Sequence, residues 1–250
     1  GSAKAILTLG DGRQVALDKK PIELLVNKQQ MVTGDSATLN YSIVLPASET
    51  EQIQRQEVAE YHTIEVPAGG EYHLVLADGT KIWLNAESSL VFPVEFSGNK
   101  RQVILKGEAY FDVTKKKKTP FIVRTDKYDI EVLGTQFDVD AYPDQTAFET
   151  TLMKGSVKVT SQHFPEQTIT LKPHHKAYVK DGQLAVTKVN DFTPYRWKEG
   201  LICFKDEPFQ TIMEDFEKYY GIRIIINNKK VLKYSYNGKF RQADGIDYAL

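Results

Sequence analysis

The sequence predicts a mainly β protein, with an antiparallel β-sandwich or solenoid-like domain followed by a small α+β domain. From residue 5 to about 190, short runs rich in Val, Ile, Phe, Tyr and Thr alternate with turn residues. This is the pattern of packed strands, not of helical crossovers. Hydrophobic residues make up 41% of the 250 residues, which suits an ordinary core. After residue 190 a helical pattern appears between strand-like runs.

Two segments share one hairpin pattern. Residues 7–18 and 74–85 both place Asp-Gly between alternating runs, with Leu at matching positions on each side. Asp-Gly indicates a tight turn, because glycine tolerates a positive φ. We expect two equivalent hairpins in stacked β layers. The alternative is that a common hairpin sequence pattern occurs twice by chance. Further strands are expected at residues 40–45, 91–96, 102–106, 109–113, 120–125, 128–133, 136–142, 147–153, 156–160, 168–172, 176–180 and 184–188.

The chain divides into three predicted regions. Residues 1–60 hold N-terminal hairpins and a linker region that pack on the β domain, and residues 46–60 are rich in Pro, Ser, Thr, Glu and Gln, as in mobile linkers. Residues 61–190 form the main β domain. Residues 191–250 form the small α+β domain, which we expect to be truncated at its C-terminal end. No apolar run is long enough to span a bilayer.

The C-terminal region is expected to contain two β-α-β halves, the second incomplete. Asp206-Glu207-Pro208 should start a helix, with an acidic cap and a proline in the first turn. Apolar residues fall on one helix face at Ile212, Met213, Phe216 and Tyr220. The other expected elements are a strand at 201–204, a helix stop at Gly221, a near-continuous buried strand at 222–226, a turn at Asn227-Asn228, a strand at 234–240 and a helix from Asp244.

Charge and composition argue against several functions. The formal net charge is −1, so nucleic acid is not an expected partner. The single Cys203 cannot form an internal disulfide and should be a small buried hydrophobe. Residues 115–118, four lysines, should be a solvated loop. Adjacent His174 and His175 would point to opposite faces of a strand, and neither has an acidic or cysteine neighbour at ligand spacing. We therefore expect no metal and no other cofactor.

Two alternatives to a plain protein-binding role stay open. Glu108 is the most suggestive acid for a glycoside hydrolase, yet Asp112 would lie roughly 13 Å along the strand, so a carboxylate that holds a bend is favoured. The 13 tyrosines could stack on the sugar rings of a glycan, although Tyr also simply favours strands. With no nucleophile elbow or phosphate-binding loop, we expect a pocket-free platform without enzyme activity.

A long, ordered series of motifs over residues 61–200 resembles the FecR domain. The series comprises Gly69-Gly70-Glu71-Tyr72 and residues 78–86, 92–93, 107–113, 120–123, 132–137, 150–152 and 155–159. Residues 197–250 resemble the C-terminal domain appended to FecR proteins, which is similar to the short secretin and TonB-type (STN) fold. Two sites depart from the family pattern: Asp138 stands where Asn is usual, and Pro173-His174-His175 stands where Pro-Gly-Gln is usual.

The resemblance implies the periplasmic part of a single-pass inner-membrane anti-sigma factor. In such proteins a cytoplasmic segment holds an ECF sigma factor, and the periplasmic part meets the N-terminal signalling domain of a TonB-dependent outer-membrane transporter. The sigma-binding segment and the transmembrane helix are expected to be absent from this piece. A glycan-binding β module of an uptake system is the alternative function.

Exposed strand edges of the C-terminal domain could pair with a strand of the partner. We expect six residues to be core or contact residues at this end, each with plain core packing as the alternative: Phe204, Tyr219, Tyr220, Ile222, Ile224 and Tyr236.

Overall fold

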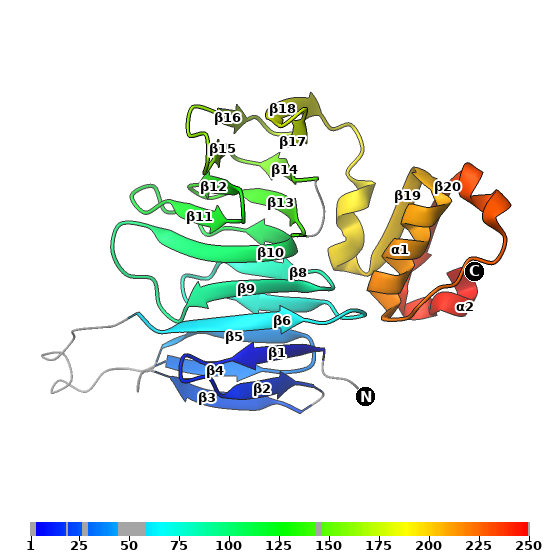
Figure 1. The fold of residues 1–250 in the computed structure, drawn as a ribbon. Coiled ribbons are helices and arrows are strands. Elements are labelled where there is room, and N and C mark those ends of the chain that lie inside the picture. Colours follow the sequence, from blue (N-terminus) through cyan, green and yellow to red (C-terminus); the bar gives the residue numbers. More distant parts are fainter. Residues whose placement is uncertain (1–3, 19, 27–29, 45–58, 144–146, 250) are drawn as a thin grey trace, which may run out of the picture.

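Two β-sheets packed against each other form the main body of the protein (Figure 1). The computed structural model describes residues 4–18, 20–26, 30–44, 59–143 and 147–249. The first sheet runs in the order β2 (Gln14–Leu17), β1 (Ala5–Thr8), β6 (Tyr61–Val66), β9 (Ser88–Pro93), β10 (Arg101–Asp112), β11 (Phe121–Arg124), β12 (Tyr128–Val132), β15 (Val157–Ser161), β16 (Thr168–Leu171).

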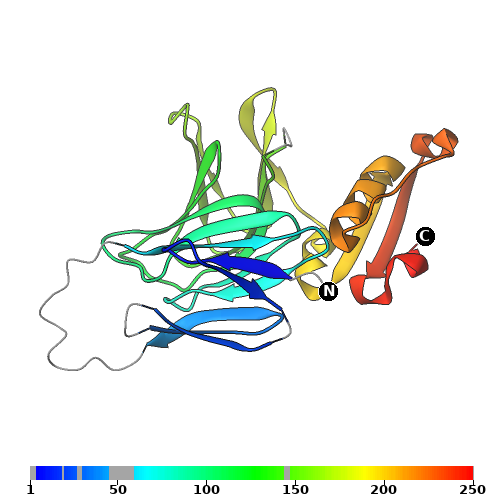
Figure 2. The ribbon, with the colours of Figure 1, turned by 60° about the horizontal axis from the view of Figure 1, so that its bottom comes forward.

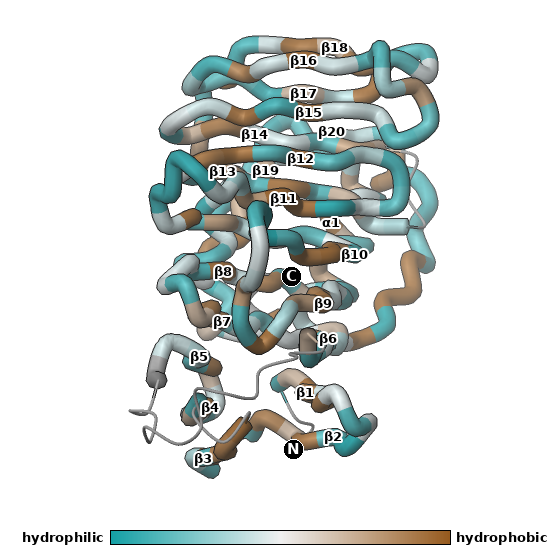
Figure 3. Tube along the Cα trace, turned by 90° about the vertical axis from the view of Figure 1, so that its left-hand side faces the viewer, coloured by the Kyte–Doolittle hydropathy of each residue, from teal (hydrophilic) through white to brown (hydrophobic). Residues whose placement is uncertain are grey.

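The second sheet lies across the core from the first. Its order is β3 (Ile22–Val26), β4 (Gln30–Gly34), β5 (Thr38–Val44), β7 (Tyr72–Val75), β8 (Lys81–Leu84), the second half of β10, β13 (Gln136–Ala141), β14 (Glu149–Lys154), β17 (His175–Lys180), β18 (Gln183–Lys188). The pairs are antiparallel except β10–β11 and β5–β7. Viewed from the side, the strands stack as successive rungs (Figure 3). The predicted fold class is confirmed.

Strand alternation explains where the core lies. Along β6, β8 and β12 every second residue is buried, because successive side chains of a strand point to opposite faces. The buried side chains of both sheets join in one apolar cluster, which is the dominant stabilising contribution in a fold without disulfides. The expected linker at 46–60 lies almost entirely outside the described residues, while residues 115–118 are an exposed loop, as predicted.

The two expected hairpins are equivalent. β1–β2 and β7–β8 are both antiparallel. In the first turn Gly12 donates its N–H to the Leu9 carbonyl, and in the second Gly79 donates to Leu76. The φ angles of Gly12 and Gly79 are 85° and 83°, so both turns need the left-handed conformation that glycine adopts most readily.

An ion pair inside the body ties the second of these turns to β10. Arg101 Nη1 lies 2.7 Å from Asp78 Oδ2, and both side chains are only 2% exposed. The same guanidinium donates to the carbonyl oxygens of Thr114 and Thr119. Because this charge is paired and hydrogen-bonded, its burial is tolerated, whereas either partner alone would be strongly destabilising.

Strand β10 joins the two sheets at a bend. Its first half pairs with β9 and β11 and its second half with β8 and β13. Gly107 lies at the transition with φ 97°, and a Cβ there would come within 2.3 Å of the Ser88 hydroxyl. Glu108, expected at a bend, follows directly, and its N–H donates to that hydroxyl.

The C-terminal domain is a two-stranded sheet with one main helix. It comprises η1 (Thr193–Glu199), β19 (Leu201–Pro208), α1 (Phe209–Tyr220), η2 (Lys229–Lys233), β20 (Ser235–Arg241), η3 (Gln242–Asp244) and α2 (Ile246–Ala249). The predicted helix face of Ile212, Met213 and Phe216 is buried, and Gly221 ends α1 in the left-handed conformation.

Two secondary-structure predictions for this domain are wrong, and with them the arrangement in two β-α-β halves, because no described strand follows α1 before η2. Asp206 and Glu207 do not cap a helix: they belong to β19, where Asp206, with φ 51°, lies in a bulge and donates its N–H to Asn237. Residues 222–226 form no strand in the structure. Their alternation is nevertheless that of a strand, because Ile224 and Ile226 pack on the domain core while Ile225 is 75% exposed. No described strand pairs with them.

None of the helices in the described ranges has the length and apolar character needed to cross a membrane.

Candidate domain interface and partner-binding surface

The outward face of the second sheet carries two rows of polar and aromatic side chains. Directly paired residues of neighbouring strands lie on the same face of a sheet. The registers of β7, β8, β10, β13 and β14 therefore align one row, consisting of His73, Trp83, Tyr110, Asp138 and Thr151. The second row consists of Asn85, Glu108, Asp140 and Glu149. His73 and Trp83 stack with ring centroids 4.5 Å apart.

The C-terminal domain lies against this side of the second sheet (Figure 1) and contacts side chains of both rows. From η1, the ammonium of Lys198 lies 4.6 Å from the ring centre of Tyr110 and 5.5 Å from that of Trp83, within the range of cation–π attraction. From α1, Tyr219 accepts a 3.4 Å hydrogen bond from Asn85. We call this contact the domain interface.

A close backbone approach completes the domain interface. Gly69, in the loop before β7, donates its N–H to the carbonyl of Lys218 at 2.6 Å. A Cβ on Gly69 would lie 3.1 Å from the backbone nitrogen of Gly221. The loop therefore fits against the C-terminal end of α1 only because both positions lack side chains.

Three carboxyl groups of the two rows lie within the domain interface. Burial, with the nearby Asp140 adding to it, raises the pKa of Glu108 to about 7, while Asn85 donates a 2.6 Å hydrogen bond to its carboxylate. Burial and then Glu108 raise the pKa of Asp138 well above its ordinary value. Burial also raises the pKa of Asp140 to about 6. Lys218 of α1 opposes this effect at Glu108 and Asp140. The interface thus holds three acids whose ionisation is less favourable than in water, chiefly because they are buried.

The position of Glu108 does not suit a glycosidase. Its nearest acid across the sheet is Asp140, directly opposite in register, and not Asp112 as considered from the sequence. Glycoside hydrolysis needs two carboxyl groups that flank an accessible sugar. None of the three cavities described in the structure is lined by Glu108 or Asp140. In the structure Asn85 donates to Glu108 and also to Tyr219 of the docked C-terminal domain.

The six residues expected at the relay end separate into three groups. Phe204 belongs to the core, and Tyr220 and Ile224 pack against it. Tyr219 lies in the domain interface. Only Ile222 and Tyr236, exposed by 39% and 42%, reach the surface.

Sequence reasoning missed two exposed apolar residues of the same domain. Ile225 is 75% exposed and Tyr234 is 59% exposed. Alternation along residues 222–226 could have identified Ile225, because it has opposite orientation to Ile224 and Ile226. We call Ile222, Ile225, Tyr234 and Tyr236 the exposed apolar set. Basic side chains adjoin it in sequence at Arg223, Lys229, Lys230 and Lys233, all of them exposed.

The cysteine and the histidines contribute no reactive cluster. Cys203 is half-buried and not buried as predicted, because it points away from the face of β19 that carries Ile202 and Phe204. Burial raises the pKa of its thiol. His174 lies in the turn before β17 with φ 65°. Within the described ranges, no group of three or more His, Cys, Asp or Glu side chains could hold a metal ion.

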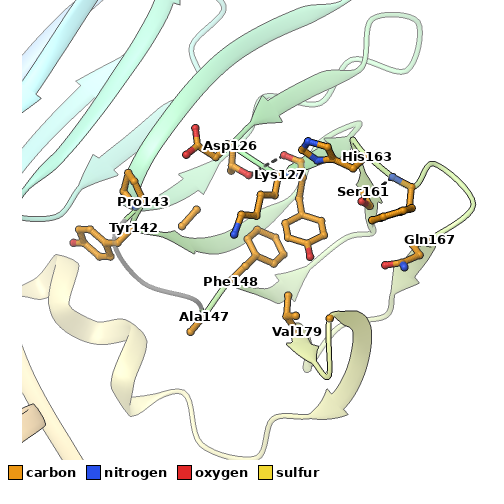
Figure 4. A pocket seen from close by; sticks show the side chains of 15 residues that line it. Asp126, Lys127, Tyr142, Pro143, Ala147, Phe148, Ser161, His163, Gln167 and Val179 are labelled. Carbon is orange, nitrogen blue, oxygen red and sulfur yellow. Dashed lines mark hydrogen bonds between the residues drawn. The ribbon is translucent and has the colours of Figure 1, made fainter.

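The expectation of a pocket-free body is wrong. A cavity of about 800 Å³ lies beside the domain interface, lined by residues of both domains that include Trp83 and Lys198. Another, of about 470 Å³, opens between the turns at one end of the sandwich (Figure 4). Sequence alternation could not predict either one, because each is formed where separate elements meet.

These features define a class of protein: a β-sandwich that carries a small mixed domain and presents exposed apolar side chains on that domain. Residues 62–158 match the family model of the FecR protein, and residues 201–250 match that of the FecR C-terminal domain. The chain belongs to the FecR family.

Solved structures agree with this assignment. The chain is similar to a candidate anti-sigma factor from Parabacteroides distasonis ATCC 8503, solved at 1.65 Å, with 28% identity and a TM-score of 0.66 over 75% of this chain and 88% of that one. A second such structure, at 2.50 Å, shows 29% identity and a TM-score of 0.64 over 73% and 85%. No curated protein matches the chain. Family and relatives support an anti-sigma signalling role and point to a non-enzymatic regulator.

Proposed function

We propose that this chain is the periplasmic, signal-receiving region of a transmembrane anti-sigma factor. In this role it binds the N-terminal signalling domain of a TonB-dependent outer-membrane transporter and relays the transporter's state to an ECF sigma factor held by a cytoplasmic segment. The chain itself would perform no catalysis.

The observation that carries the proposal is the exposed apolar set on the C-terminal domain. Ile225 extends into solvent from a strand-like segment that no described strand pairs with. Unpaired strand edges and exposed apolar side chains are the two features through which β domains add a partner strand. Exposed Arg223 and Lys229 beside them favour a partner with acidic residues at its edge.

The domain interface supplies the second half of a relay. Tyr219 and Lys218 of α1 contact the outer face of the second sheet, while α1 also packs on the core behind the strand-like segment through Phe216. A partner that pairs with residues 222–226 would therefore act on the same helix that holds the two domains together.

The test is binding between this chain and the N-terminal signalling domain of a TonB-dependent transporter from the same organism. Ile225→Lys and Tyr236→Ala should each weaken binding by about tenfold or more, as for residues that dominate an interface. Tyr61→Ala is the matched control, because Tyr61 is 51% exposed but lies on the β-sandwich. Absence of wild-type binding at high micromolar concentration, or equal binding by all variants, would contradict the proposal.

A further inference from the structure

A cleft opens where the two sheets end in separate turns. Its lining comes from the β11–β12, β15–β16 and β17–β18 turns and from the flanks of β13 and β14. Its volume of about 470 Å³ falls within the range of small-molecule sites. Figure 4 shows Phe148 near the middle of the cleft, with His163 and Gln167 on one side and Tyr142 on the other. In Figure 2 the hairpin of β15 and β16 stands apart from that of β17 and β18.

Aromatic rings provide the apolar part of the lining. Tyr128 and Phe148 stack with ring centroids 4.3 Å apart, and they are only 7% and 6% exposed. At the rim, Phe164 is 56% exposed. The cleft therefore has a floor of two stacked, buried aromatic rings and an exposed ring beside it.

Polar side chains, most of them without a hydrogen-bond partner in the described ranges, provide the rest of the lining. Asp126, Lys127, His163 and Gln167 line the cleft, and the side chains of Asp126, His163 and Gln167 make no hydrogen bond to another residue in the described ranges. One carboxylate and one ammonium side by side leave the lining without a strong net charge. These groups offer both donors and acceptors to a ligand.

This combination selects one class of ligand. A purely apolar molecule would leave the polar groups without partners when it displaced their water, which is costly. An anion would meet the carboxylate of Asp126. A sugar ring matches both features, because its C–H face packs on aromatic rings and its hydroxyls pair with carboxylate, amide and imidazole groups. We propose that this cleft binds a neutral saccharide.

The cleft touches the domain interface through one side chain. Tyr142 lines the cleft, and its hydroxyl donates a 2.8 Å hydrogen bond to the carbonyl of Ala86. The ammonium of Lys218, on α1, lies 4.8 Å from the centre of the same ring. A sugar against Tyr142 would shift the contact that helps to hold α1. This coupling rests on the proposed relay function, whereas saccharide binding does not.

The test uses three neutral trisaccharides as probes: maltotriose, cellotriose and triacetylchitotriose, with the open-chain sorbitol as a control. Saturation-transfer NMR and calorimetry on the whole chain should detect at least one of them with a Kd of about 1 mM or tighter. Phe164→Ala and Gln167→Ala should each weaken that binding by about tenfold, which corresponds to about 1.4 kcal/mol. Tyr61→Ala, which removes an aromatic ring exposed to a similar extent, should leave it unchanged.

The outcomes separate the proposals. If no trisaccharide binds at about ten times that concentration, or if binding persists unchanged in both cleft variants, the saccharide site is refuted. The binding test with the signalling domain of the transporter needs no sugar, so its success or failure is judged independently of saccharide binding. Coupling is read from tryptophan fluorescence, because Trp83 lies in the domain interface. Lys218→Met removes the ammonium beside the Tyr142 ring without altering a residue of the cleft lining. It should keep saccharide binding but reduce the fluorescence change, and an undiminished change would refute the coupling.

Discussion

Replacing Glu108 with Gln tests whether the domain interface holds a carboxyl group that resists ionisation. Gln keeps the size of the side chain and an oxygen that can accept the hydrogen bond from Asn85, but it cannot carry a negative charge. Wild-type Glu108 must ionise at neutral pH beside Asp140 and beneath the C-terminal domain. We therefore expect Glu108→Gln to be more stable than wild type at pH 7.5 and nearly equal to it at pH 4.5.

The magnitude follows from the pKa. In the folded protein the pKa of Glu108 is raised from 4.5 to about 7 by burial. Between these values the folded state binds more protons than the unfolded state, so the free energy of unfolding falls as pH rises from about 4.5 to 7 and then levels off. At about 1.4 kcal/mol per pKa unit the full difference is about 3 kcal/mol. Glu108 retains some contact with water, so we expect about 1–2 kcal/mol.

Urea unfolding followed by tryptophan fluorescence at pH 4.5, 6 and 7.5 measures this effect, since the midpoint and slope give the free energy of unfolding. Glu95→Gln is the control, because Glu95 is exposed, and it should follow the wild-type curve. If Glu108→Gln gains nothing at pH 7.5, or if its pH dependence matches that of wild type, then Glu108 does not ionise at a cost in the folded protein.

Three further substitutions test the fold and the domain interface. Arg101→Ala leaves Asp78 buried without its partner and should cost about 3–5 kcal/mol in urea unfolding; a loss below about 1 kcal/mol would contradict a fully buried ion pair. Gly107→Ala places a Cβ within 2.3 Å of Ser88 Oγ, whereas Gly98→Ala, also at positive φ, meets open space. Gly107→Ala should lower the free energy of unfolding by at least about 2 kcal/mol more than Gly98→Ala. Equal losses would exclude the clash with Ser88. Gly69→Ala presses on the backbone at Gly221 and should loosen α1 from the sandwich. Limited proteolysis of the segment between β18 and η1, which joins the sandwich to the C-terminal domain, should then accelerate severalfold relative to Gly12→Ala. Equal rates would show that the contact does not hold the domains together.

Much of the β domain could be predicted because its determinants are local. Alternation of apolar residues identifies which face of a strand is buried, and Asp-Gly identifies a turn wherever two such strands are adjacent. The hairpins at 7–18 and 74–85 follow from these two rules alone. The expected bend lies at Gly107, beside Glu108, but it is the backbone N–H of Glu108 and not its carboxylate that bonds there, and positive φ explains the glycine.

The predictions for the C-terminal domain were less accurate because strand pairing between distant residues overrides the local preferences of the sequence there. Residues 222–226 have the composition of a strand, but a strand exists only where another one pairs with it, and no described segment does. Asp206 has the chemistry of a helix cap, yet the pairing of β19 with β20 places it in a bulge instead. The sequence indicates Ile222 and Tyr236 as candidate contact residues, whereas the exposure of Ile225 and Tyr234 is a property of the folded domain.

The sequence by itself determined the class of fold, the two matching hairpins and the family, since each depends on residues that are neighbours along the chain. Tertiary structure decided which carboxyl groups face each other, how α1 docks and where the cleft opens. Glu108 meets Asp140 and not Asp112 because strand register brings together residues that are far apart in the chain. Burial of Glu108 at this position then raises the pKa of its carboxyl group above the ordinary value for glutamate.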